Sequence, residues 1–181
     1  MPDAAQCGHR AKKAMDTSNV YIVCGIPGSG KSTWLKNHVA SDSNAVIVSR
    51  DAIRFSLLKE DEDYFAHEDE VVRIFTETIQ AAVAAGRTVY VDATHLTWNA
   101  RKKVVDAVGA PNVRIGALCI TAPLHICLER NSRRNGRARV PDDVISRMSQ
   151  MFTNPETDPF QYSEVAFIDT TKTEHDLKEG A

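Results

Sequence analysis

Short runs of apolar, β-branched and aromatic residues alternate along the chain with segments in which apolar residues recur every three or four positions. Such runs are typical of buried strands, and the segments between them are typical of amphipathic helices. The predicted strands span residues 20–24, 45–49, 88–92, 113–120 and 164–169. The alternation predicts a three-layer α/β/α fold with a five-stranded, mostly parallel sheet.

The helical pattern is clearest between His67 and Gly86, where the glycine marks the expected end of the helix. Other helices are predicted for residues 32–40, 98–108 and 124–135, and a last one after Pro141. In that last helix an apolar stripe is expected to face the core; it consists of Val144, Ile145, Met148, Met151 and Phe152. The length of the chain fits one domain, at residues 19–171.

A glycine-rich segment lies between the first predicted strand and the first helix. It reads Gly25-Ile26-Pro27-Gly28-Ser29-Gly30-Lys31-Ser32-Thr33 and fits the GxxxxGK[ST] pattern of a phosphate loop in the strand–loop–helix context that this motif requires. Backbone N–H groups of such a loop bind phosphates at a helix N-terminus. Lys31 would reach the β- and γ-phosphates of ATP, and the Ser32 hydroxyl would bind Mg²⁺. The expected nucleotide site comprises Gly25, Pro27, Gly28, Ser29, Gly30, Lys31, Ser32 and Thr33. The alternative is an ordinary glycine-rich turn.

Polar residues follow the second predicted strand. Arg50 and Asp51 come at its C-terminal end, where ligands gather in open parallel sheets, and Arg54 lies three residues further on one helical face. Asp51 is the candidate general base for a hydroxyl acceptor, and Arg54 could hold a substrate phosphate. Alternatively, Asp51 is a charge at a helix N-terminus that pairs with a nearby arginine.

The third predicted strand ends in Asp92-Ala93-Thr94-His95. Asp92 could act as a Walker-B-type carboxylate, bonded through water to Mg²⁺ or to Ser32. Thr94 and His95 could line the acceptor pocket. A strand-to-helix turn with local hydrogen bonds is the competing interpretation for these two residues.

Beyond the fourth predicted strand the chain becomes basic. Arg130 and Arg134 are four residues apart, so they would share a helical face and could close together on a polyphosphate. A mobile lid over the transferring phosphoryl group is predicted at residues 130–140. A solvated basic helix is the alternative.

The composition limits which partners and which cellular compartment we expect for this protein. The formal net charge of −2 gives no global basic field, so a nucleic-acid partner would have to meet a local patch. The four cysteines form no CxxC pair, and no apolar run is long enough to span a bilayer, so we expect reduced thiols in a cytoplasmic protein. Residues 1–18 are expected to be a disordered tail and residues 172–181 a polar one. We expect no membrane contact and no obligate protein partner.

Taken together, these segments resemble the polynucleotide 5′-hydroxyl kinases of the phage type, within the phosphate-loop kinase superfamily. The resemblance runs from about residue 20 to residue 169. It rests on the phosphate loop, on Arg50-Asp51-Ala52-Ile53-Arg54, and on Arg130-Asn131-Ser132-Arg133-Arg134 followed by Val140-Pro141-Asp142.

The resemblance implies ATP and Mg²⁺ as cofactors and the 5′-OH end of DNA or RNA as acceptor. It implies that Asp51 is the general base, that Arg54 contacts the phosphate next to the acceptor nucleotide, and that Arg130 and Arg134 contact the ATP phosphates. The chain departs from the pattern at Ala93, where the phage kinase has a carboxylate that Asp92 would replace. Bifunctional relatives add a phosphatase domain for which this chain has no room, so we expect no 3′-phosphatase activity.

Other functions use much of the same machinery. The acceptor could be a hydroxymethylated base within DNA, or a small metabolite or nucleotide sugar, as in kinases of the zeta-toxin kind. A nucleotide-dependent switch without catalysis is a further alternative, against which Asp51 and the lid arginines argue. No GTP-specific NKxD segment occurs, so ATP is the expected nucleotide.

Overall fold

The computed structural model describes residues 20–109 and 112–172. The predicted N-terminal tail, and all of the predicted C-terminal tail except Lys172, lie outside these residues. The strands are β1 (Val20–Cys24), β2 (Ala45–Ser49), β3 (Thr88–Asp92), β4 (Ile115–Thr121) and β5 (Glu164–Asp169). The helices are α2 (Lys31–Val39), α3 (Arg50–Leu57), α4 (Glu68–Ala84), α5 (Trp98–Val108), α6 (Leu124–Ser132) and α7 (Asp142–Gln150), with 3₁₀ turns η1 (Gly136–Ala138) and η2 (Pro155–Thr157). No helix in the described ranges is long and apolar enough to cross a membrane.

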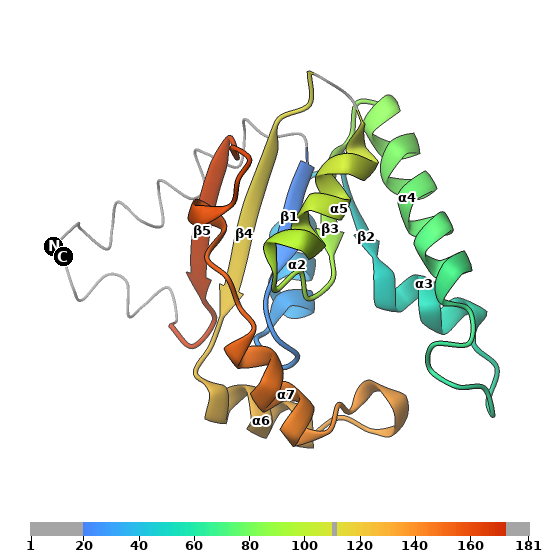
Figure 1. Cartoon of the computed structure of the whole chain (residues 1–181), viewed down its shortest axis with the longest axis vertical. Coiled ribbons are helices and arrows are strands. Elements are labelled where there is room, and N and C mark those ends of the chain that lie inside the picture. Colours follow the sequence, from blue (N-terminus) through green and yellow to red (C-terminus); the bar gives the residue numbers. More distant parts are fainter. Residues whose placement is uncertain (1–19, 110–111, 173–181) are drawn as a thin grey trace, which may run out of the picture.

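The strands form one five-stranded sheet in the order β2-β3-β1-β4-β5, and every neighbouring pair is parallel. The sheet of the predicted three-layer fold is therefore confirmed. After β1 the chain adds β2 and β3 on one side of this strand, and then β4 and β5 on the other. A crevice opens at the carboxyl end of β1, because the connections change direction there. In Figure 1, the first turns of α2 and α3 and the helices α6 and α7 all lie toward this end of the sheet.

Alternate residues of β1 face two separate apolar layers. Val20, Ile22 and Cys24 pack in the layer that contains residues of α4 and α5, such as Ile79 and Val104. Tyr21 and Val23 pack in the opposite layer against Leu35 of α2. All five residues of β1 are fully buried, which is typical of a central parallel strand covered on both faces.

Arg101, one of the basic residues near the start of α5, is fully buried in an ion pair with Asp158. Its Nε and Nη2 atoms each donate to the carboxylate at 2.7 Å, and Nη1 donates to the His95 carbonyl at 3.0 Å. Tyr162 also donates to Asp158, at 2.7 Å. The buried charge of Arg101 is therefore neutralised by Asp158, 57 residues later in the chain.

Two predictions about α6 and α7 were wrong in detail. Helix α6 ends at Ser132, not at residue 135, so Arg134 does not extend the helical face of Arg130. The stripe on α7 is not uniformly core, because Met151 is 53% exposed and Val144 and Met148 line a cavity. Ile145 alone of the five stripe residues is fully buried.

Candidate active site

The phosphate loop packs closely against neighbouring backbone. A Cβ atom on Gly28 would lie 2.2 Å from the carbonyl oxygen of Cys127 in α6, and Gly28 has a φ of +85°. A Cβ atom on Gly25 would lie 2.4 Å from the carbonyl oxygen of Ile120. Both contacts require glycine, and the first joins the loop to the helix that leads into the lid.

Lys31 begins α2, and its ammonium group turns back over the loop. Its Nζ atom donates to the carbonyls of Gly25 at 2.8 Å and Ile26 at 3.0 Å. Burial lowers the pKa of Lys31, the Asp92 carboxylate opposes this change, and the Arg134 charge adds to it. The ammonium is thus held next to a second cation and a carboxylate, which suits the binding of a polyanion.

A cavity of about 740 Å³ lies beside the loop at the carboxyl end of the sheet. Its lining comes from the phosphate loop, from α3 and the connection to α4, from the end of β3, from the lid and from α7. It brings together many of the residues predicted from the sequence: Pro27, Lys31, Ser32, Arg50, Asp51, Arg54, Asp92, Thr94 and Arg134. Segments more than 100 residues apart in the chain therefore meet in one cavity.

Other predicted site residues lie outside this lining. Arg130 donates to the hydroxyl of Thr170 at 2.8 Å, so its guanidinium is beside the loop but held by the segment after β5. His95 is 5% exposed, and its Nδ1 lies 2.8 Å from the Val23 carbonyl, so the ring supports β1 from within the core. Thr33 is exposed on α2.

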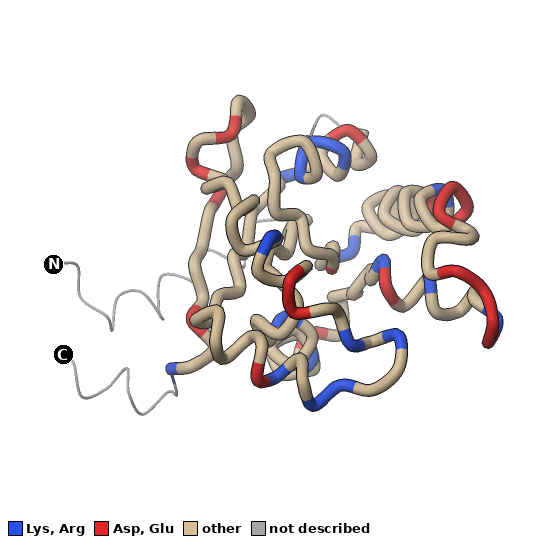
Figure 2. Tube along the Cα trace, turned by 60° about the horizontal axis from the view of Figure 1, so that its bottom comes forward, with Lys and Arg blue, Asp and Glu red and all other residues tan. Residues whose placement is uncertain are grey.

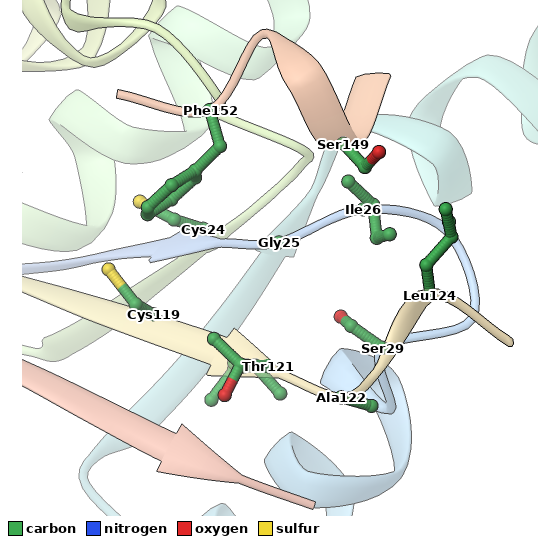
Figure 3. A pocket seen from close by; sticks show the side chains of 11 residues that line it. Cys24, Gly25, Ile26, Ser29, Cys119, Thr121, Ala122, Leu124, Ser149 and Phe152 are labelled. Atoms are coloured by element: carbon green, nitrogen blue, oxygen red, sulfur yellow. The ribbon is translucent and has the colours of Figure 1, made fainter. Parts of the chain in front are cut away.

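Ser29 lies on a different, smaller cavity. This space of about 190 Å³ is bordered by the loop, the end of β4 and Phe152 after α7 (Figure 3). The side chains of Cys24 and Cys119 border it together with the buried Ser29 hydroxyl. Gly25 borders it too, so the residues of the predicted nucleotide site face two cavities.

Asp51 is held by two hydrogen bonds within the large cavity. Its Oδ1 atom accepts from Nη1 of Arg54 and from the hydroxyl of Tyr64, each at 2.9 Å. The Asp51 side chain is 64% exposed, whereas that of Arg54 is 6% exposed. Arg54 and Tyr64 therefore hold the Asp51 carboxylate in place, and the carboxylate remains accessible from the cavity.

Glu68, the first residue of α4, holds both arginines of this wall. It accepts from Nη2 of Arg54 at 2.5 Å and also pairs with Arg50. Burial alone would raise the pKa of Glu68, but the hydrogen bond from Arg54 and the charge of Arg50 outweigh it and lower the pKa. The carboxylate thus stays ionised and fixes the arginine that touches Asp51.

Sequence reasoning missed Glu68 and the aromatic residues of this wall, Phe55, Tyr64 and Phe65. A local signal exists only for Tyr64 and Phe65, which are adjacent aromatic residues inside a connection otherwise rich in acidic residues. Two adjacent aromatic residues are unusual in a solvated connection, and such residues on loops often serve binding.

Ser32 and Asp92 provide oxygen donors on the same cavity. Asp92 ends β3, pairs in register with Ser49 and is 9% exposed. Burial raises its pKa, while the Lys31 ammonium opposes this. Hydroxyl and carboxylate oxygens are the donor types that Mg²⁺ prefers next to nucleotide phosphates, so these residues fit that ion.

The segment predicted as a lid, residues 130–140, is closed at its base by Asn131. This fully buried side chain donates to the Val140 carbonyl at 2.7 Å and accepts from the Val140 N–H at 3.1 Å. At the tip, Arg137 donates to the carbonyls of Lys59 and Glu62, each at 2.8 Å, and also to that of Glu60. Basic positions follow one another along this segment (Figure 2), and it spans the cavity from α6 to the α3–α4 connection.

The buried ring of His95 predicts a pH dependence of stability. Burial lowers its pKa to about 4 from an ordinary value near 6.5, although the hydrogen bond to Val23 opposes this. The neutral ring is fully compatible with the fold above pH 6.5, and stability is lost as the pH falls toward 4, by up to about 3 kcal/mol. Urea unfolding at pH 7 and pH 4.5 should show a smaller loss in His95→Asn, since asparagine tolerates the φ of 40° at this position and does not titrate. An equal loss in both proteins would contradict this assignment.

Comparison with protein-family models identifies the family of this chain. Residues 20–155 match the family model described as an AAA domain. The chain belongs to this AAA-domain family. The matched region contains the phosphate loop, Asp51 and residues 130–140, but ends before β5.

Solved structures share the fold of this AAA domain at low sequence identity. A chain of the Pnkp1/Rnl/Hen1 RNA repair complex superimposes with a TM-score of 0.65 at 20% identity, covering 74% of this chain and 43% of that one. A sugar kinase from Janibacter sp. HTCC2649 superimposes with a TM-score of 0.61 at 18% identity, and the match covers 90% of this chain and 91% of that one. A fungal RNA kinase superimposes with a TM-score of 0.60 at 12% identity, and the match covers 88% of this chain and 77% of that one. The chain thus has the fold of phosphate-loop kinases, and it spans less than half of the RNA repair chain that it matches.

Proposed function

We propose that this protein is an ATP-dependent kinase that transfers the γ-phosphoryl group to a hydroxyl of a nucleic acid, most directly the 5′-OH end of DNA or RNA. The observation that carries the proposal is that Asp51, with Arg54 hydrogen-bonded to it, lines the same cavity as Lys31 and Ser32 of the phosphate loop. A base for the acceptor, a cation beside that base and the phosphate site thereby share one space.

The residues divide the reaction between them. The loop backbone and Lys31 bind the ATP phosphates. Ser32 and Asp92 would hold Mg²⁺, which would neutralise negative charge on the phosphates. Asp51 takes the proton of the acceptor hydroxyl. The hydroxyl oxygen forms a bond to the γ-phosphorus, and the bond between this phosphorus and the ADP oxygen breaks. Arg54 binds the phosphate next to the acceptor nucleotide, and Arg134, near Lys31, faces the transferring group.

Charge on the cavity wall favours a polyanionic acceptor. Basic side chains outnumber acidic ones among its lining residues, although the whole chain carries a net charge of −2. The basic residues are Lys31, Arg50, Arg54, Arg134, Arg137 and Arg139. The acidic residues are Asp51, Glu68 and Asp92. This local excess supports a nucleic acid over a neutral sugar.

The second candidate is a small-metabolite kinase. It is favoured by the sugar kinase from Janibacter, whose fold matches nearly the full length of both chains. A hydroxymethylated base within DNA remains a third acceptor that the same residues could serve.

The test is transfer of labelled γ-phosphate from ATP with Mg²⁺ to three acceptors. These are a 5′-hydroxyl oligonucleotide, the same oligonucleotide already 5′-phosphorylated, and a duplex with internal hydroxymethylated bases. We expect label on the first alone, and much slower labelling with the Asp51→Asn variant. Label only on the duplex would move the acceptor to the DNA interior, and no label on any acceptor would favour a small metabolite.

A further inference from the structure

Three aromatic side chains line one wall of the large cavity. Phe55 comes from α3, and Tyr64 and Phe65 come from the connection to α4. Their rings meet edge to face, with centroids 6.1 Å apart for Phe55 and Tyr64 and 4.9 Å apart for Tyr64 and Phe65. We name these three residues the aromatic wall.

The aromatic wall leaves much apolar surface facing outward. Phe65 is 62% exposed and Phe55 is 41% exposed, the first being the highest value among the large exposed apolar side chains of the described residues. Neither ring is thus explained by packing in the core, since exposed phenylalanine gains little from the fold. Exposed rings that border a cavity are typical of a surface that a ligand covers.

A fixed cation adjoins the aromatic wall. The guanidinium carbon of Arg54 lies 4.6 Å from the centroid of the Tyr64 ring and 5.5 Å from that of the Phe65 ring. The Tyr64 hydroxyl donates to Asp51, and burial raises its pKa, so the phenol keeps the proton that makes this bond. The candidate base Asp51, the Arg54 guanidinium and the aromatic rings are therefore neighbours on one wall of the cavity.

This sequence of groups matches the parts of a nucleotide. A 5′-hydroxyl at Asp51 and a phosphate near Arg54 would leave the base of the same nucleotide within reach of the rings. Stacking on aromatic rings accepts any base, because every base has a π-face. A base inside a duplex is already stacked and paired, so it cannot be covered in this way without being released.

Resting on the proposed function, we propose that the aromatic wall stacks the terminal base of the acceptor, so that the substrate is an unpaired 5′ end. The wall selects single-stranded or frayed ends over blunt duplex ends. It does so without preference for one base.

The test compares an oligonucleotide that has a 5′-terminal adenosine with one that is abasic at that position. We expect the abasic change to raise the KM of the wild-type protein roughly tenfold, the size typical of one stacked base. Phe65→Leu should raise the KM for the normal oligonucleotide by a similar factor and hardly affect the abasic one. The KM for ATP should not change.

Phe167→Leu is the matched control, because Phe167 on β5 is 44% exposed and lies outside the cavity. It should behave as wild type with both oligonucleotides. Equal KM values for the normal and abasic oligonucleotides, or no effect of Phe65→Leu, would overturn the proposal.

A binding measurement separates this inference from the proposed function. Fluorescence anisotropy of the 3′-labelled oligonucleotide with the Asp51→Asn protein needs no catalysis. If the oligonucleotide binds more weakly when Phe65→Leu is added, the aromatic wall contacts the base even if no phosphate is transferred. Undiminished or absent binding would refute the stacking role, whatever the kinase assay shows.

Discussion

Asp51→Asn is expected to lower kcat for phosphoryl transfer by about 10²- to 10⁴-fold, the usual contribution of a general base. Asparagine keeps an oxygen that can accept from Arg54 and Tyr64, but it loses the basicity needed to take a proton from the acceptor. The Kd for ATP should stay within about twofold, because Asp51 belongs to α3 and not to the phosphate loop. Single-turnover kinetics and equilibrium nucleotide binding check the two halves of this prediction.

The matched control is Asp69→Asn. Asp69 also lies in the first turn of a helix and is exposed, but it does not line the cavity. This control removes one negative charge from the same region and should leave kcat unchanged. Unimpaired turnover in Asp51→Asn would remove Asp51 from the mechanism.

Arg101→Met should lower the free energy of unfolding by about 3–5 kcal/mol, the cost of removing one partner from a buried ion pair. The change leaves the Asp158 carboxylate, whose side chain is 1% exposed, without its bidentate partner. It also removes the donor to the His95 carbonyl, so the turn after β3 loses support. Urea denaturation at pH 7, followed by far-UV circular dichroism, measures the loss.

The neighbouring Lys102→Met is the control for this substitution. Lys102 pairs with Asp106, but their side chains are 49% and 58% exposed, so the change should cost less than about 1 kcal/mol. Asp158→Asn tests the pair from the other side and should destabilise the fold as well. A loss for Arg101→Met no larger than that for Lys102→Met would show that burial does not govern this pair.

Local signals made the fold and the phosphate loop predictable. The loop is a contiguous motif between a strand and a helix, and each strand is a short apolar run whose character does not depend on distant residues. The residues at the ends of β2 and β3 could be placed near one another because parallel strands bring their carboxyl ends to one edge. The catalytic roles of Asp51, Arg54 and Arg134 remain predictions.

Features that depend on long-range partners were not predictable. Glu68 holds Arg50 and Arg54 from another helix, and nothing in the local pattern indicates that contact. The histidine after β3 looked like a pocket residue by position, but its ring turns into the core toward Val23. The end of α6 depends on Asn131, whose hydrogen bonds to Val140 turn the chain sooner than the helical pattern suggested.

The contact between Arg137 and the α3–α4 connection has a consequence for how this protein can change. Arg137 reaches only main-chain oxygens there, at Lys59, Glu60 and Glu62. Main-chain oxygens are present whatever side chains a segment carries. Side chains at these three positions can therefore change while residues 130–140 stay attached to the α3–α4 connection through one guanidinium.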